Sequence, residues 1–157
     1  MAGVCGGFNA ADDLNWQADV RFLLKTEETS QPINFAVKEE VYGIMREALA
    51  NAFIHANPST VQIVIRYSDE FRVECSDDGI GIDPAVLERG GVDGHWGLQG
   101  MRERAKRIAA QFEIRPRQGG GTTVEIALSG RRAYMSSQRG KRNRFLDLVR
   151  RTIFLEH

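Results

Sequence analysis

Three polar residues, Glu47, Asn51 and His55, follow one another at intervals of four residues in a segment with helical periodicity. At about 100° per residue, this spacing places a carboxylate, an amide and an imidazole along one stripe at the flank of the apolar side. A carboxylate there can polarise a water or a metal's ligand sphere, and an amide oxygen is a hard ligand suited to Mg²⁺. The same spacing would also arise if the three residues only lined a solvated helix edge.

An acidic segment with alternating glycines, residues 77–83 (DDGIGID), directly follows an expected strand. Gly79 and Gly81 let the backbone adopt positive φ and let a ligand approach the chain closely. The carboxylate of Asp77, just before them, can accept a hydrogen bond from an exocyclic amine. A calcium-binding turn or an ordinary acidic turn would contain the same residues, so this motif alone has two interpretations.

A glycine-containing junction, residues 94–101 (GHWGLQGM), leads into a second helical segment. Free backbone N–H groups and the positive end of the helix dipole make such a junction an anion site. His95 and Trp96 could latch a lid or could only pack within the loop. The basic side chains that follow could attract an anion or form a solvated helix face; they are Arg102, Arg104, Lys106 and Arg107.

The backbone of residues 119–123 (GGGTT) could also lie close to a ligand, and Thr122 could donate a hydrogen bond to a phosphate. A flexible hairpin tip is the alternative. Other catalytic signatures are absent from the sequence. There is no Gly-x-x-x-x-Gly-Lys-[Ser/Thr] phosphate loop, no paired Cys or His cluster for zinc, and no Gly-x-Ser-x-Gly elbow.

The elements that must position these residues follow from hydrophobic periodicity. Alternation predicts a strand over residues 19–25, and spacing of three to four residues predicts a helix over residues 35–56, stopped by Asn57 and Pro58. The apolar stripe of that helix consists of Val37, Val41, Ile44, Met45, Ala48 and Ala52.

The rest of the chain continues the same mixture of elements. Residues 61–67 and 71–75 predict a hairpin with one buried face, residues 98–111 a second helix, and residues 112–117 and 122–128 another strand pair. The apolar side of the second helix consists of Leu98, Met101, Ala105, Ile108 and Ala109. We expect an α+β domain, a two-layer α/β sandwich whose mixed, mostly antiparallel sheet is covered on one face by helices.

Composition bounds the class of protein. The 157 residues include 21 Lys and Arg and 21 Asp and Glu, so the formal net charge is zero and does not indicate nucleic-acid binding. Cys5 and Cys75 follow no metal-ligand or redox spacing, which indicates free thiols in a reducing compartment. The sequence has no run of 18 apolar residues and no signal peptide, so we expect a soluble piece; a longer, membrane-bound parent remains open.

Domain boundaries follow from these patterns. We expect a loose lead-in over residues 1–17, one folded domain over 18–134, a basic tail over 135–154 that is helical or partly disordered, and a tag remnant over 155–157. Between residues 131 and 151 there are eight basic side chains and one acid, Asp147.

The four motifs, in this order and on these elements, together resemble the ATPase superfamily of histidine kinases, gyrase, mismatch-repair and chaperone ATPases, which share the Bergerat fold. Residues 47–56 (EALANAFIHA) resemble that family's N box, residues 77–81 its Asp-x-Gly-x-Gly box, and residues 119–122 its last glycine box. Residues 97–105 (GLQGMRERA) resemble the sensor kinases whose response regulators bind DNA through a helix-turn-helix. The resemblance covers residues 18–134.

The resemblance implies a role for each matching position. Asn51 would ligate the Mg²⁺ that bridges the ATP phosphates, Glu47 would act beside it as base or as partner of a metal-bound water, and His55 would lie near the phosphates. Asp77 would accept from the adenine amino group. Other ATP contacts implied in this way are Gly79, Gly81, Gly97, Leu98, Gln99, Gly100, Met101 and Thr122.

The resemblance also implies a transfer of the ATP γ-phosphoryl group to a histidine on a separate phosphoacceptor and dimerisation domain, and through it to a response regulator. The three histidines, His55, His95 and His157, lack the neighbouring acid of a phosphoacceptor site, so we expect this chain to bind ATP without phosphorylating itself. We expect a cytoplasmic, monomeric or weakly associated domain without direct nucleic-acid contact. A serine kinase of the anti-sigma type and a nucleotide sensor without transfer are the alternatives.

Overall fold

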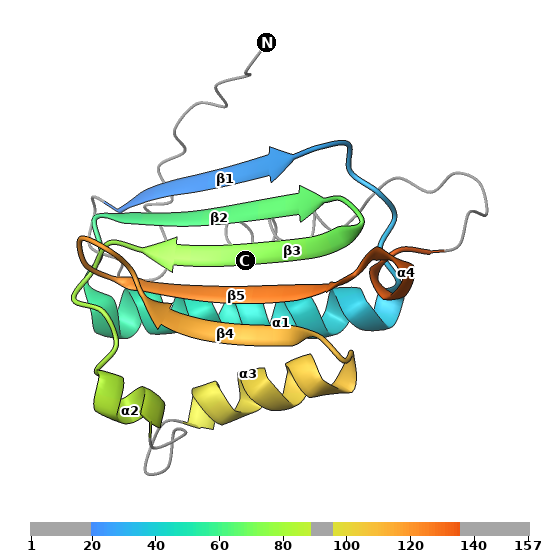
Figure 1. Ribbon diagram of the computed structural model, residues 1–157. Helices are drawn as coiled ribbons and strands as arrows, with labels where there is room; N and C mark the ends of the chain where they lie inside the picture. The colour runs from blue at the N-terminus through green and yellow to red at the C-terminus, as the bar shows by residue number, and fades with distance from the viewer. Residues whose placement is uncertain (1–19, 89–95, 136–157) are drawn as a thin grey trace, which may run out of the picture.

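The computed structural model describes residues 20–88 and 96–135 (Figure 1). The expected lead-in over residues 1–17, residues 136–154 of the expected tail, the expected tag remnant, Cys5 and His95 lie outside the described residues. None of the helices in the described part is both long and apolar enough to cross a membrane.

A five-stranded sheet forms one layer, with the strand order β1-β2-β3-β5-β4. β1 runs parallel to β2, whereas the other neighbouring pairs are antiparallel, which confirms the predicted mixed and mostly antiparallel sheet. The predicted hairpin and both later strands are confirmed, and the first strand lies two residues further along than predicted. The strands are β1 (Arg21–Glu27), β2 (Thr60–Tyr67), β3 (Glu70–Asp77), β4 (Gln111–Pro116) and β5 (Thr122–Ser129).

Helices form the second layer (Figure 1). α1 (Phe35–Asn51) continues into a π-helical turn, η1 (Ala52–Ala56), so the predicted helix over 35–56 is confirmed with a wider last turn. α1 contacts β3 and α3 (Trp96–Arg107), and α3 contacts β4. Two short helices, α2 (Pro84–Glu88) and α4 (Gly130–Ala133), were not predicted.

The core lies between the sheet and α1. Every member of the predicted α1 stripe is buried, and so are the alternating residues of β2, β3 and β5 that face it. Burial of these side chains supplies most of the stabilisation, at about 25 cal/mol per Å² of apolar surface removed from water. The core therefore fixes α1 against β3, which brings the polar flank of α1 to the end of the sheet where β3 ends.

The end of α3 differs from the prediction. We predicted a helix to Gln111, but α3 ends at Arg107, Ala109 is exposed with φ of 50°, and Gln111 begins β4. The Ala109 amide donates to the Lys106 carbonyl at 3.0 Å and the Ala110 amide to the Ala105 carbonyl at 2.9 Å. This pair of bonds is a Schellman cap, in which glycine normally occupies the left-handed position. Alanine gives no such signal in a sequence.

Replacing Ala109 by glycine is therefore expected to raise the free energy of unfolding by about 0.5–1 kcal/mol, because glycine adopts positive φ without the β-carbon clash. Urea denaturation of the variant and the parent measures the difference. Ala110→Gly is the matched control: Ala110 has no positive φ and packs against the core, so that variant is expected to lose stability. A loss of stability in both variants would contradict the cap assignment.

Candidate nucleotide-binding site

Asp77 is the last residue of β3 and points to the helix-covered face, where its side chain is buried, with 5% of the residue exposed. Its Oδ1 accepts the amide of Gly79 at 2.9 Å, and its Oδ2 accepts the amide of Thr122 at 3.3 Å. A carboxylate has about four acceptor positions, so these two bonds orient the group and leave capacity for a further donor.

The electrostatic setting of Asp77 favours a bound donor. Burial raises the pKa of its carboxyl above the ordinary value, although the amides of Gly79 and Thr122 and the charge of Arg117 act in the opposite direction; the neighbouring Asp78 raises it further. A poorly hydrated acceptor forms stronger hydrogen bonds with a ligand than an exposed one does. An amino group that enters the site therefore meets an oriented and incompletely solvated acceptor.

The neighbouring Asp78, for which the sequence predicted no role, has a different function. Its Oδ1 accepts the amides of Ser59 at 2.8 Å and Thr60 at 2.7 Å, at the start of β2. These bonds fasten the loop that follows β3 and contains Gly79 and Gly81, called the glycine loop below, to the sheet. Of the two adjacent carboxylates, Asp77 is the buried one, whereas Asp78 binds the start of β2.

The glycine loop lies directly against the end of η1. The Ile80 amide donates to the Ala56 carbonyl at 2.9 Å, and a β-carbon at Gly79 would lie 2.1 Å from that same oxygen. Glycine at position 79 is therefore required for packing of the loop on η1. A π-helical turn is frequent at functional sites, and here its last residue offers its carbonyl to the loop.

The turn between β4 and β5 packs against the other side of the glycine loop. Gly81 has φ of 79°, and a β-carbon there would lie 3.1 Å from the Gly121 carbonyl oxygen. Gly121 has φ of 93°, and a β-carbon there would lie 1.9 Å from the Asp77 carbonyl oxygen. Backbone thus packs on backbone between the two predicted glycine boxes, and the structure brings them together.

The first turn of α3 lies on the polar flank of α1. A β-carbon at Gly97 would lie 2.0 Å from Glu47 Oε1, so the half-buried Glu47 side chain occupies the space that glycine leaves. Leu98 and Met101 are buried in the core and hold this end of α3 in place. A β-carbon at Gly100 would meet no atom within 4 Å, so its surroundings are open.

The remaining predicted residues occupy the same region. Asn51 is the half-buried last residue of α1, one turn beyond Glu47, whereas His55 is exposed on η1. Gln99 is exposed and donates to Glu103 at 2.9 Å along α3. The stripe of Glu47, Asn51 and His55 thus runs along α1 and η1. It begins at Glu47, beside the start of α3, and ends near the glycine loop.

Two of the basic residues of α3 form ion pairs with α1. Arg104 and Arg107 each form an ion pair with Glu40 of α1 at 3.0 Å. Lys106 is exposed. Two of the four basic side chains therefore fasten α3 to α1, and the N–H groups at the start of α3 remain the main expected source of attraction for an anion.

The oxygen ligands that the site offers suit Mg²⁺, which binds few protein groups, better than a metal that is coordinated by protein side chains alone. Within residues 20–88 and 96–135, no group of three or more His, Cys, Asp or Glu side chains gathers into a metal cage. Mg²⁺ is ordinarily bound by one or two protein oxygens together with substrate phosphates and water. One amide oxygen from Asn51 with Glu47 beside it fits that requirement.

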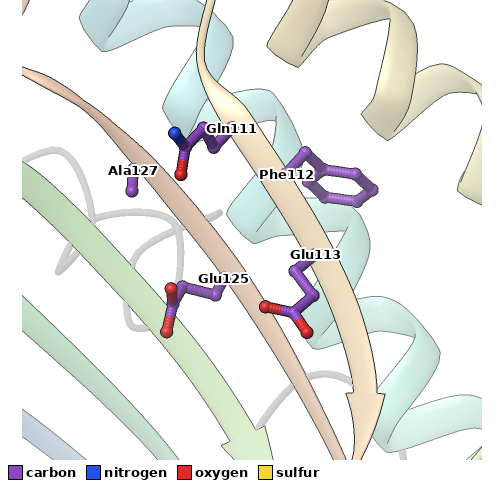
Figure 2. Close-up of a pocket in the computed structure, with 5 residues that line it drawn as sticks. All are labelled: Gln111, Phe112, Glu113, Glu125 and Ala127. Carbon is purple, nitrogen blue, oxygen red and sulfur yellow. The ribbon is translucent and has the colours of Figure 1, made fainter.

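A different hollow, of about 270 Å³, lies across β4 and β5 and is lined by Gln111, Phe112, Glu113, Glu125 and Ala127 (Figure 2). It contains none of the predicted site residues. Gln111 pairs with Ala127 and Glu113 with Glu125, and these positions alternate with the core residues Phe112 and Ile126. The hollow is thus on the sheet face away from α1 and is not the candidate site.

Sequence reasoning missed one residue at the site, Arg117. Its Nη1 donates to the Asp77 carbonyl at 3.3 Å. No sequence pattern indicates this contact, because it depends on the pairing of β3 with β5, which brings together residues 40 positions apart.

Comparison with known proteins identifies the family of the chain. The family described as "Histidine kinase-, DNA gyrase B-, and HSP90-like ATPase" matches residues 36–132. The sensor protein NarQ homolog of Haemophilus influenzae is 34% identical over 119 residues, which cover 74% of this chain and 20% of that protein. The sensor histidine kinase YdfH of Bacillus subtilis is 34% identical over 101 residues, covering 62% and 24%. This chain thus spans about a fifth to a quarter of these relatives' length.

Solved structures show the same fold. The ATP-binding domain of PrrB from Mycobacterium tuberculosis superposes with a TM-score of 0.58 at 17% identity, covering 73% of this chain and 82% of that domain. The histidine kinase domain of the blue-light activated kinase EL346 from Erythrobacter litoralis gives 0.56 at 22% identity, covering 72% and 52%. The predicted Bergerat fold is confirmed. The chain belongs to the histidine kinase-, DNA gyrase B-, and HSP90-like ATPase family, as an ATP-binding catalytic domain of the sensor histidine kinase type.

Proposed function

We propose that this chain binds Mg-ATP between α1, the glycine loop and the start of α3, and donates the γ-phosphoryl group to a histidine on a separate domain of its parent protein. The observation that carries the proposal is the buried Asp77 carboxylate, oriented by the amides of Gly79 and Thr122 beside two close backbone approaches. This arrangement is suited to a flat base that carries an amino group.

Each wall of the site has its own task in the proposal. Asp77 accepts from the adenine amino group, while the backbone at Gly79 and Gly81 approaches the base. Asn51 ligates Mg²⁺, which neutralises phosphate charge when it is bound. Glu47 takes the proton of the attacking imidazole, directly or through water, as the new N–P bond forms and ADP leaves.

The phosphates occupy the other end of the site. The residues of the ATP lid and of the helix N-terminus next to it in the proposal are Gly97, Leu98, Gln99, Gly100 and Met101. Their role is supported by the open space at Gly100 and by the helix N-terminus. The side chains of Leu98 and Met101 are buried in the core, so these two residues would contribute through their backbone. Thr122 closes the pocket near Asp77, and His55 lies at the phosphate side. Transfer of this kind needs positioning and charge neutralisation more than covalent help from protein.

The proposed partners follow from the relatives, which are sensor kinases. The phosphoacceptor and dimerisation domain of the parent would receive the phosphoryl group on its histidine, and a response regulator would then receive it from that histidine. The ATP-binding domain itself would not contact nucleic acid. The domain would lie in the cytoplasm as part of a parent anchored in the inner membrane. A serine kinase of the anti-sigma type is not favoured, since the relatives named above are sensor kinases.

The test is a transfer reaction. The chain is incubated with Mg²⁺, γ-labelled ATP and the parent's phosphoacceptor domain, and the labelled domain is then treated with acid and with alkali. We expect a label that acid removes and alkali does not, as for phosphohistidine, and no label on a His→Gln acceptor. A label that survives acid would assign a serine or threonine kinase instead.

The magnesium role of Asn51 has its own test. Asn51→Ala is expected to lower the affinity for Mg-ATP by roughly tenfold, the scale of one lost charge-assisted contact, and to leave the affinity for ATP in EDTA unchanged. Calorimetric titrations with and without Mg²⁺ measure both affinities. Gln111→Ala, which removes an amide from the opposite sheet face, is expected to change neither; an equal loss with and without Mg²⁺ in Asn51→Ala would contradict the ligand role.

A further inference from the structure

Arg117 begins the turn that joins β4 to β5, and the backbone of that turn is closed on itself. The Arg117 amide donates to the Gly121 carbonyl at 3.0 Å, and the Gly120 amide donates to the Arg117 carbonyl at 3.2 Å. These two bonds fix the position from which the Arg117 side chain starts. Its guanidinium then donates to the Asp77 carbonyl at 3.3 Å.

Asp77 is consequently held at three oxygens. Arg117 binds its main-chain oxygen, Gly79 its Oδ1 and Thr122 its Oδ2. The Gly79 and Thr122 bonds come from backbone amides and use no side-chain donor. The bond to the main-chain oxygen comes from a side chain, so the identity of residue 117 decides whether it exists.

The nearest arginine in the sequence shows that this placement is particular to Arg117. Arg115 lies on β4 and pairs with Glu74 at 3.6 Å, Glu113 at 3.3 Å and Glu125 at 3.4 Å. These carboxylates lie on the sheet face away from α1. Arg115 therefore stabilises the sheet surface, whereas Arg117, two residues later, is exposed and its guanidinium reaches the main-chain oxygen of Asp77.

We propose that Arg117 is a positioning residue that fixes the peptide of Asp77 and so sets how strongly the pocket prefers a purine with a 6-amino group. The proposal rests on the proposed ATP site. A guanidinium on the Asp77 carbonyl limits rotation of that peptide and keeps the carboxylate in one orientation towards an incoming amine. Without it, the acceptor is still present but less well aimed, which weakens a directional bond.

The experiment compares two ligands that differ only in that amino group, ATP and purine riboside triphosphate, in calorimetric titrations of the full chain with Mg²⁺. We expect the parent chain to prefer ATP, and Arg117→Gln to reduce the ratio of the two affinities by roughly three- to tenfold, the scale of one misaligned hydrogen bond. Arg115→Gln, the matched control, is expected to keep the parent ratio. Melting curves of both variants verify folding.

The outcomes separate the two proposals. If Arg117→Gln weakens both nucleotides equally, the residue acts only through its charge on the phosphates, and the positioning role is overturned. If the parent chain binds neither nucleotide, the proposed ATP site fails first. The amide resonances of Gly79 and Thr122 in the nucleotide-free chain then still test the positioning. They should shift in Arg117→Gln and not in Arg115→Gln, and unchanged resonances would overturn it. Arg117→Lys, which shortens the reach, substitutes if the glutamine variant does not fold.

Discussion

Gly121→Ala is expected to destabilise the domain by about 3 kcal/mol and to abolish ATP binding. Two costs combine at this position. The residue has φ of 93°, where a side chain is strained, and its β-carbon would lie 1.9 Å from the Asp77 carbonyl oxygen and 2.9 Å from the Asp78 α-carbon. Because both neighbours are backbone atoms, no change of rotamer relieves the overlap. The turn must move away from Asp77, which also breaks the Thr122 bond.

Gly119→Ala is the matched control for this variant. Gly119 has φ of 87°, close to that of Gly121, but a β-carbon there would meet nothing within 4 Å. This variant therefore carries the backbone strain, about 1–2 kcal/mol, without the overlap. Urea denaturation and ATP titration of both variants separate the two contributions. Equal losses of stability and of ATP affinity in both variants would show that the contact with Asp77 is unimportant.

Asp77→Asn is expected to weaken ATP binding by about 1–3 kcal/mol, roughly 5- to 150-fold, because a charge-assisted acceptor of the adenine amino group becomes a neutral amide. The amide has a single oxygen, so it can accept from Gly79 or from Thr122 but not from both with its original orientation. Calorimetry measures the affinity. Asp69→Asn, an exposed carboxylate in the turn between β2 and β3, is the control and is expected to bind ATP as the parent does.

The pH dependence of binding gives a second readout of Asp77. Because burial raises the pKa of this carboxyl, its charge is lost at a higher pH than that of an ordinary aspartate. ATP affinity should therefore fall as the pH is lowered through that raised pKa, and this fall should be absent in Asp77→Asn. An identical pH profile in parent and variant would remove Asp77 from the adenine contact.

The architecture was predictable because its signals are local. Alternation marks β2 and β3, and the buried stripe of α1 recurs every three to four residues, so both follow from the sequence. The end of α3 was not predictable, because alanine occupies the left-handed position of its cap. The short helices α2 and α4 contain one turn each and carry no periodic pattern.

The site was predictable as a set of motifs, but its internal contacts were not. The glycines indicate close approaches without naming what approaches them. The partner of Gly121 is Asp77 and the partner of Gly97 is Glu47, and both contacts join segments that are distant in the sequence. The difference between Asp77 and Asp78 likewise depends on partners that are distant in the sequence: Asp78 accepts the amides of Ser59 and Thr60, and Asp77 accepts the amide of Thr122. Arg117 has its role only because β5 lies beside β3.

The central claim is that ATP binds on the helix-covered face, between the glycine loop and α3. Titration of the ¹⁵N-labelled chain with Mg-ATP, followed through backbone amide resonances, tests it most directly. We expect saturable shifts at Gly79, Gly81 and Thr122, whereas the resonances of Gln111 and Glu113, which line the hollow in Figure 2, should not change. Shifts confined to that hollow, or no shifts at saturating Mg-ATP, would contradict it.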